Sequence, residues 1–399
     1  MDKDYEKIKE IIKNLEPELR ELTRKIHDNP EVGNQEFKAC LWQKTLLEKY
    51  GFSVENPYLE LSTAYKAVFK GKKSGPKIAM LAEYDALKSI GHGCGHNLIA
   101  MVGVGAGIVI KPFVEKYGGE IHVVGTPAEE TDGAKVKMAD KGAFAEYDVV
   151  MMAHPAYEFL DSVNSSAIEG IKVEFFGKAA HAAENPQDGI NALDAVINLF
   201  NLVNAMRQQT KDGTRIHGII TAGGVEPNTI PDYAAAEFYV RDHRMSGVHN
   251  LIKKMKLCAE GAAAGTGTTM KFTIEEGGFK DTVSNQTLNK LACSHMEELG
   301  AAIEYTNGVP AAGSSDLGNV SYECPAIQPY FKIGNPPKGE SVKSFHTKDF
   351  EQKAISEEAI SNGLLFIEGF TRTAIDLMNN PELVKAIKEE FKLAMEGCA

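Results

Sequence analysis

The sequence lacks several features that mark specialised classes of protein. It has only six cysteines in 399 residues, too few and too scattered for a disulfide scaffold. Acidic residues outnumber basic ones by 55 to 43, and the net charge of -12 argues against a nucleic acid or an anionic membrane as partner. The longest weakly polar run, residues 98–110, is too short and too rich in glycine to span a membrane.

The N-terminal stretch also lacks the apolar core of a secretory signal peptide, so we expect a cytoplasmic protein with reduced cysteines. What is present is ordinary for a soluble globular chain, with 43% hydrophobic and 25% charged residues. A chain of this length is too long for one ordinary core, so two domains are expected.

Alternating helical and strand-like segments predict an α/β fold with a mostly parallel sheet at both ends of the chain. Apolar residues recur at helical spacing over residues 4–28, and a second helix is predicted from about residue 36 to residue 50. Four β-like runs follow, and helices are predicted near the C-terminus. These segments occupy residues 63–71, 77–85, 119–130 and 147–156 for the strands, and 350–378 and 381–396 for the helices.

A different pattern occupies residues 169–281. The order of predicted elements there is β-α-β-β-α-β, which is typical of a compact split βαβ sandwich. We therefore predict one domain made of residues 1–168 and 282–399, with a second, ferredoxin-like domain inserted at 169–281.

The segment "AEYDALKSIGHGCGHNLIA", residues 82–100, directly follows the predicted strand 77–85. Its glycines alternate with His92, Cys94 and His96 and let the backbone approach a bound group. Thiolate and imidazole are good zinc ligands, and Asp85 is suited to accept the spare ring N–H of a ligating histidine. The segment therefore indicates a metal site at the carboxyl end of a strand.

Two later strand ends carry the same kind of chemistry. "TPAEE" places Glu129 and Glu130 side by side, and "AHPA" places His154 at the end of the next strand. One glutamate of such a pair can ligate metal while the other serves as general base. "KSFHTKDF" adds His346 in a loop before a helix.

Three other interpretations stay open at this point. His96 and Cys94 can be ordinary buried residues with no role in chemistry. Cys94 can be a nucleophile with a histidine as base, which would make the protein a cysteine hydrolase. The chain can also be a binding protein that has the fold and no catalytic activity.

Taken together, the motifs resemble the metallopeptidase family that contains aminoacylase and the glutamate-specific carboxypeptidases. The resemblance is strongest to its amidohydrolase branch, with the indole-acetyl-amino-acid hydrolases and p-aminobenzoyl-glutamate hydrolase. It spans nearly the whole chain, and it implies that residues 1–168 and 282–399 form the metal-binding catalytic domain and that residues 169–281 form a lid or dimerisation domain. The motifs that carry it are "HDNPEVGNQEF", "EYDAL", "GHGCGHN", "TPAEE", "MMAHPA", "GKAAHAAENPQDGINALDA", "GGVEPNTIPDYAAAEFYVR", "GSSDLGNVS" and "FHT".

The resemblance implies a role for each matching residue. Five residues match the ligands of a centre of two divalent ions, zinc or manganese: Cys94, His96, Glu130, His154 and His346. Glu129 matches the general base, and Asp85 the acid that orients a ligand histidine. His181 matches a histidine that stabilises the oxyanion in the partner subunit's active site. Asn228 and Arg241 match residues that hold the substrate carboxylate.

The expected activity is hydrolysis of an N-acyl amino acid or a dipeptide with a free carboxylate, by a homodimer that binds neither nucleic acid nor membrane. Two departures from the branch concern residues near the ligands. Asn97 stands where many members have aspartate after the ligand histidine, and Lys88 stands where proline is common.

Overall fold

The computed structural model describes residues 2–306, 313–342 and 345–397, which form two compact units. Unit 1 contains residues 2–164, 282–306, 316–342 and 345–397, and unit 2 contains residues 165–281 and 313–315. The second division falls at 281/282, as expected for the inserted domain. The first falls at 164/165 rather than 168/169, because the first strand of unit 2 already begins at Ala167.

Unit 1 is built on a six-stranded sheet in the order β1-β2-β4-β3-β5-β11. Its strands are β1 (Ser53–Glu55), β2 (Tyr65–Lys70), β3 (Lys77–Ala82), β4 (Glu120–Gly125), β5 (Val149–Met151) and β11 (Ala326–Ile327). β4, β3, β5 and β11 pair in parallel, whereas β2 is antiparallel to both of its neighbours. The prediction of a mostly parallel sheet is confirmed, in a mixed sheet with one reversed strand.

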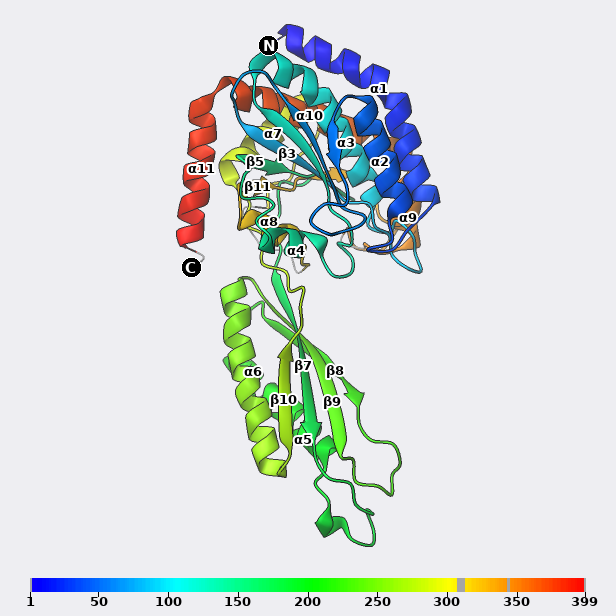
Figure 1. The fold of residues 1–399 in the computed structure, drawn as a ribbon, viewed down its shortest axis with the longest axis vertical. Coiled ribbons are helices and arrows are strands. Elements are labelled where there is room, and N and C mark those ends of the chain that lie inside the picture. Colours follow the sequence, from blue (N-terminus) through cyan, green and yellow to red (C-terminus); the bar gives the residue numbers. More distant parts are fainter. Residues whose placement is uncertain (1, 307–312, 343–344, 398–399) are drawn as a thin grey trace. The chain divides into compact units, whose positions relative to one another are not determined.

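Helices cover both faces of this sheet (Figure 1). They are α1 (Asp2–Asp28), α2 (Phe37–Lys49), α3 (His96–Tyr117), α4 (Ala134–Asp140), α7 (Gln286–Glu298), α8 (Leu317–Ser321), α9 (Lys348–Lys353), α10 (Glu357–Asn379) and α11 (Pro381–Glu396). α3 is long and apolar enough to cross a membrane by length and composition alone, but 89% of its most apolar window is buried. Because β3, β4, α1 and α10 pack against it, α3 is the central helix of the unit 1 core.

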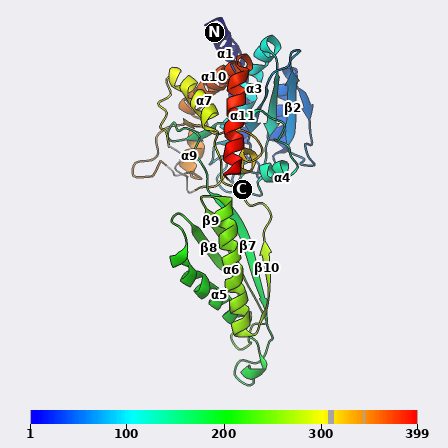
Figure 2. The same cartoon turned by 90° about the vertical axis from the view of Figure 1, so that its left-hand side faces the viewer.

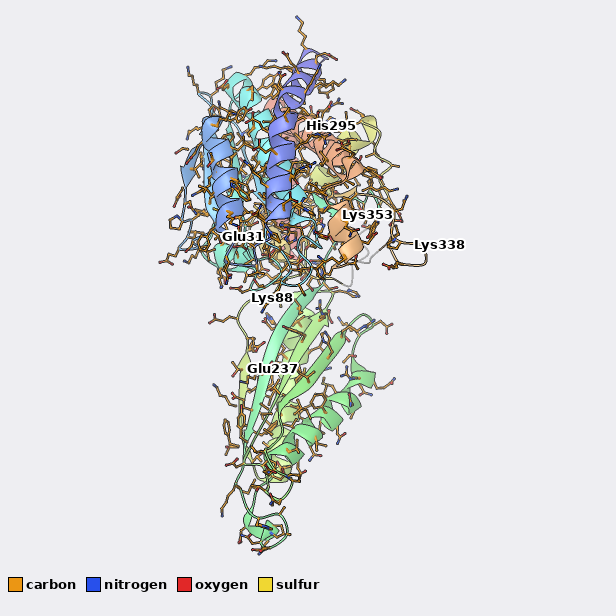
Figure 3. All side chains as sticks on the ribbon, turned by 90° about the vertical axis from the view of Figure 1, so that its right-hand side faces the viewer. Glu31, Lys88, Glu237, His295, Lys338 and Lys353 are labelled. Atoms are coloured by element: carbon orange, nitrogen blue, oxygen red, sulfur yellow. The ribbon has the colours of Figure 1, made fainter. Side chains whose placement is uncertain are left out.

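Local sequence explains the first two helices. The apolar residues Ile8, Leu15 and Leu19 of α1 lie on one face and are at most 1% exposed, as their helical spacing predicts. The start of α2 lacks a capping bond from its own N-cap residue. Glu31 lies near one end of α2 (Figure 3). Its carboxylate accepts hydrogen bonds from the backbone N–H groups of Lys38 and Ala39, which also suits the positive end of the helix dipole.

Unit 2 has the predicted β-α-β-β-α-β order. Its elements are β7 (Ala167–Phe176), α5 (Ala192–Met206), β8 (Arg215–Ala222), β9 (Tyr233–Asp242), α6 (Met245–Thr266) and β10 (Thr269–Ile274), with short 3₁₀ turns at Pro186–Asp188 and Arg207–Gln209. The sheet is antiparallel in the order β10-β7-β9-β8, and α5 and α6 pack side by side against it (Figure 2). The resulting core is apolar.

Two predicted elements are each divided in the structure. The run 147–156 forms β5 and then β6 (His154–Ala156), which leaves the main sheet and pairs in parallel with β12 (Tyr330–Lys332). The single helix predicted over 350–378 is α9 followed by α10, because Ser356 caps a new helix by accepting the N–H of Ala359. Apolar spacing continues across both breaks, so periodicity alone did not reveal them.

Candidate metal centre

The carboxyl ends of three neighbouring parallel strands define the site in unit 1. β4, β3 and β5 lie next to one another and run in the same direction, so the residues after them gather at one edge of the sheet. Asp85 follows β3, Glu129 and Glu130 follow β4, and His154 follows β5 as the first residue of β6. This is the arrangement that the strand-end motifs predict.

Gly95 shapes the loop that carries Cys94 and His96. Its φ of 74° lies in the left-handed region, and a Cβ atom there would come within 2.6 Å of Pro155 Cγ. Glycine meets both demands because it has no side chain. The turn brings Cys94 toward β6 and makes His96 the first residue of α3.

The side chains of the site contact one another closely. Cys94 Sγ lies 3.6 Å from His154 Nε2, and His346 Nε2 lies 3.1 Å from Glu130 Oε1. Asp85 accepts twice, from His96 Nδ1 at 2.8 Å and from the backbone N–H of Glu130 at 3.0 Å. Asp85 therefore fixes the orientation of the His96 ring, in the way predicted for it.

The possible ligand atoms form overlapping groups, each with all its atoms within 4.8 Å of one another. Among the described residues these groups are Cys94 with His96 and His154, Cys94 with Glu130 and His346, His96 with Glu129 and Glu130, and Glu83 with Glu129 and Asp316. All five predicted ligands and the predicted base are thus brought together in unit 1.

A buried polar atom without a hydrogen-bond partner shows that the site fits metal ions. His96 Nε2 is buried and has no hydrogen-bond partner in the described part of the chain, and buried Glu130 Oε1 faces His346 Nε2 at 3.1 Å. A buried atom without a partner is costly unless something binds it. Since Asp85 accepts from Nδ1, Nε2 is the ring atom of His96 that can bind an ion. Nitrogen, sulfur and carboxylate donors together suit zinc and its neighbours.

Burial sets the protonation of these groups before any ion is bound. Burial raises the pKa of Glu129 well above its usual range, and the nearby carboxylates of Glu83 and Asp316 raise it further. Burial likewise raises the pKa of the Cys94 thiol and lowers that of His154 to about 4. The thiolate is the form of cysteine that binds metal, so a divalent ion held at Cys94 would lower this pKa.

Two loop residues at the site adopt backbone conformations that side chains rarely take. Ala128, just before Glu129, has φ of 59°, and His346 has φ of 61°. The backbone N–H of His346 donates to the carbonyl oxygen of Gly93 at 3.0 Å, which ties its loop to the Cys94 loop. Strain of this kind persists where surrounding contacts hold it and is frequent at functional sites.

His92 belongs to the same motif and has a different role. It is buried, its Nε2 lies 3.1 Å from the carbonyl oxygen of Ile26, and its ring stacks on His27 at 6.3 Å. It is in none of the ligand groups found among the described residues. His92 therefore anchors the metal-binding loop to the end of α1.

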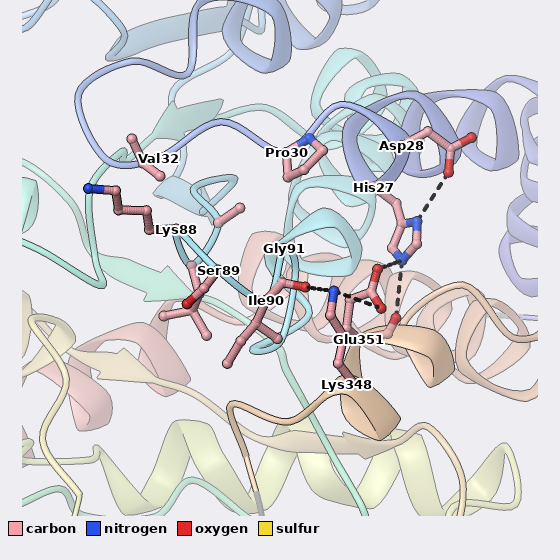
Figure 4. Close-up of a pocket in the computed structure, with 12 residues that line it drawn as sticks. His27, Asp28, Pro30, Val32, Lys88, Ser89, Ile90, Gly91, Lys348 and Glu351 are labelled. Atoms are coloured by element: carbon pink, nitrogen blue, oxygen red, sulfur yellow. Dashed lines mark hydrogen bonds and ion pairs between the residues drawn. The ribbon is translucent and has the colours of Figure 1, made fainter.

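A pocket of about 420 Å³ lies beside this loop (Figure 4). Residues 86–91 form one wall, and His27, Lys348 and Glu351 contribute to others. Figure 4 shows His27 bonded to Glu351, and Lys348 bonded to the carbonyl oxygen of Ile90. None of the candidate ligands lines the part of this pocket that the structure describes, so it is separate from the metal cluster.

The sequence interpretation missed three charged residues. Glu83, Lys135 and Asp316 are buried around the cluster, and the Lys135 ammonium donates a hydrogen bond to each of the two carboxylates. Glu83 lies two residues before Asp85, and Asp316 lies in the motif "GSSDLGNVS". Lys135 gave no signal, because one lysine in a polar stretch usually lies at the surface.

The three predicted residues of unit 2 lie at two opposite ends of its sheet. His181 and Asn228 are adjacent beyond the ends of β7 and β8, where the N–H of Ala182 donates to the carbonyl of Asn228. Arg241 lies near the other end of β9, opposite Ile168 and Arg215. From Tyr233 to Arg241 an extended strand covers about 26 Å, so one small ligand cannot contact both ends within one chain.

The known proteins that this chain is similar to are peptidases and amide hydrolases. A family model described as the peptidase dimerisation domain matches residues 165–267. The chain is 35% identical to a Xaa-Arg dipeptidase of Mus musculus over 95% of this chain and 90% of that protein. It is 27% identical to one of the subunits of p-aminobenzoyl-glutamate hydrolase of Escherichia coli, over 98% and 95% of the two chains.

Among solved structures, the fold is similar to that of YxeP of Bacillus subtilis, described as a dinuclear metal-binding peptidase of the M20 family. The TM-score is 0.70 at 19% identity, and the match covers 92% of this chain and 99% of that one. The chain belongs to the M20 peptidase family. It is therefore a metallopeptidase-type hydrolase acting on amide bonds, and the interpretations as a non-catalytic binding protein or a cysteine hydrolase are not favoured.

Proposed function

We propose that the protein is a cytoplasmic homodimer that cleaves dipeptides or N-acyl amino acids with a free α-carboxylate, using two divalent ions of zinc or manganese. The observation that carries this is the cluster of buried ligand atoms around His96 Nε2, which itself has no hydrogen-bond partner among the described residues, next to Glu129. The relatives support the substrate class, since one acts on Xaa-Arg dipeptides and another on p-aminobenzoyl-glutamate.

The proposed ligands are the five predicted from the motifs: Cys94, His96, Glu130, His154 and His346. Divalent ions held there supply Lewis acidity, which lowers the pKa of water and polarises a carbonyl group. Glu129 accepts the proton of the attacking water and delivers it to the leaving nitrogen.

His181 is suited to donate a hydrogen bond to the oxyanion. Its Nδ1 accepts from the backbone N–H groups of Ala183 and Glu184 at 3.2 and 3.1 Å. In the neutral ring the proton is then on Nε2, which makes Nε2 the donor. The residue is exposed, as expected of a group that completes a site on another subunit.

The separation of the two ends of unit 2 supports a site made from two chains. One substrate can meet Arg241, His181 and Asn228 together only if the two ends come from different subunits. Exposed apolar side chains near β8 suit an interface, and Val225, in the β8–β9 connection, is 96% exposed. Arg241 is half-buried and donates to Ser314 Oγ at 3.0 Å, and its planar guanidinium suits a carboxylate.

The test is hydrolysis by metal-stripped enzyme before and after addition of zinc, manganese or cobalt. The substrates are dipeptides ending in arginine, lysine, glutamate or leucine, together with p-aminobenzoyl-glutamate. Each substrate is paired with its C-terminally amidated form. We expect no activity without metal, recovery on addition, and loss of cleavage for the amidated forms. Full activity of stripped enzyme, with metal content checked by elemental analysis, would contradict the proposal.

A further inference from the structure

A buried lysine and two buried carboxylates lie next to the metal cluster without a part in the proposed reaction. Lys135 Nζ donates to Glu83 Oε1 and to Asp316 Oδ1, both at 2.6 Å. The backbone N–H of Lys135 also donates to Asp316 Oδ2 at 3.1 Å. The three side chains are at most 1% exposed, so their charges interact without screening by solvent.

This triad is joined to the cluster through Glu83. The second carboxylate oxygen of Glu83 lies 3.4 Å from His96 Nε2 and has no hydrogen-bond partner among the described residues. Carboxylate oxygens of Glu83, Glu129 and Asp316 all lie within 4.8 Å of one another. Three carboxylates this close form a group that would attract a cation, and the ammonium of Lys135 is bonded to two of them.

The arrangement around Glu129 depends on that ammonium. Buried charges are stable when they are paired, and removing one partner leaves an uncompensated charge. With Lys135 present, its ammonium is the fixed counter-ion of Glu83 and Asp316. Glu129 is the third carboxylate of the group, and the Lys135 ammonium is not within hydrogen-bond distance of it. If the Lys135 ammonium were removed, Glu83 and Asp316 would be available as oxygen ligands for a divalent ion.

We propose that Lys135 is a positioning residue that acts as an internal counter-cation. It holds Glu83 and Asp316, prevents both from binding metal, and so leaves Glu129 available to the reacting water. This proposal rests on the function proposed above and adds a residue that controls how many cations the site takes. A purely structural role for the triad makes a different prediction, namely that loss of Lys135 weakens metal binding or leaves it unchanged.

The first experiment is calorimetric titration of metal-stripped protein with Zn²⁺. Lys135→Met removes the charge and keeps much of the side-chain volume. We expect it to bind Zn²⁺ at least about 10-fold more tightly than the wild type, or to take up an additional equivalent. The matched control is Lys137→Met on the same helix, an exposed lysine paired with Asp132, which should behave as wild type. Equal or weaker binding by folded Lys135→Met would overturn the proposal.

A second pair of variants keeps the test decisive if Lys135→Met does not fold. Asp316→Asn removes one negative charge and can still accept the backbone N–H of residue 135, so Zn²⁺ binding should weaken about 10-fold. Adding Lys135→Met to it restores the local net charge, and binding should return to within about 3-fold of wild type. Equal binding by Asp316→Asn and the double variant would overturn the proposal.

Activity gives a separate measure at saturating metal. Lys135→Met should lose at least about 10-fold in kcat with little change in KM, and Lys135→Arg should recover part of kcat because it keeps the charge. If the wild type cleaves no substrate of the panel while the Zn²⁺ titrations behave as expected, the proposed function fails and the role of Lys135 stands. If the wild type is active and the charge variants bind Zn²⁺ alike, only the role of Lys135 fails.

Discussion

The metal cluster of unit 1 and the predicted residues of unit 2 are held in different ways. In unit 1, His96 and Asp85 are at most 1% exposed and hydrogen-bond to each other through their side chains. In unit 2, His181 and Asn228 are exposed; the His181 ring accepts from the backbone N–H groups of Ala183 and Glu184, and the Asn228 side chain accepts from the hydroxyl of its neighbour Thr229. The first region is therefore held by buried contacts between its own side chains, whereas His181 and Asn228 of the second are left open to solvent.

The largest expected effect separates the two glutamates of unit 1. Glu129→Gln should lose about 10²- to 10⁴-fold in kcat, as expected for a general base, and should keep its metal. Glu130→Gln should lose metal as well, because it removes a ligand oxygen. The measurements are kcat and metal content for both variants. The opposite pattern, with metal lost only from Glu129→Gln, would mean that the two roles are reversed.

The next effect tests whether unit 2 serves another subunit. His181→Ala should lose about 10²- to 10³-fold in kcat with metal retained, like the loss of one oxyanion donor. Mixed with inactive Glu129→Ala, it should regain activity, because one site of a mixed dimer carries neither lesion. Random exchange makes half of the dimers mixed, so about a quarter of wild-type activity is expected. No gain after demonstrated subunit exchange would exclude action across the interface.

A smaller effect concerns the other end of the unit 2 sheet. Arg241→Lys keeps the charge and loses the planar pairing with a carboxylate, so KM should rise about 10- to 100-fold with little change in kcat. Arg215→Lys, on the neighbouring strand, is the control. Its exposed guanidinium donates to the carbonyl of Thr214, and the substitution should change KM little. A rise in KM that is the same for amidated substrates would argue against carboxylate binding.

The smallest expected effect is on the pH dependence of stability, and it is compared for one buried carboxyl group in each unit. Burial, followed by the charge of Asp85, raises the pKa of Glu36 from 4.5 to about 7. Between pH 4.5 and pH 7, Glu36 is therefore protonated in the folded state and ionised in the unfolded state. The free energy of unfolding consequently falls as the pH rises through this range. Glu36→Gln removes the titrating group, so between pH 4.5 and pH 8 its free energy of unfolding should improve by about 3 kcal/mol relative to that of the wild type.

Glu169 in unit 2 is the matching case. Burial also raises its pKa to about 7, but the residue is only half-buried and solvent screens its charge. Glu169→Gln should change the pH dependence in the same direction and by less. Denaturant unfolding of both variants at the two pH values gives the comparison. An equal or larger effect at Glu169 would show that burial does not set the difference between the units.

The sequence by itself determined the two-part organisation and the ligand chemistry. Apolar spacing specified α1 and the order of elements in unit 2, since periodicity reflects which side chains face a core. The strand-end motifs identified Cys94, His96 and the Glu129–Glu130 pair, because parallel strands bring their carboxyl ends to one edge. The breaks after β5 and after α9 were missed, since there apolar spacing continues while the backbone changes partner.

Only the tertiary structure decided which charges neutralise one another and which residues share a site. Lys135, Glu83 and Asp316 are far apart in sequence, and no local pattern distinguishes a buried lysine from a surface one before its partners are placed. Asn228 and Arg241, assigned to one carboxylate from their motifs, lie near opposite ends of one sheet. Sequence spacing reports the periodicity of a segment, whereas distances across a fold depend on strand pairing and packing.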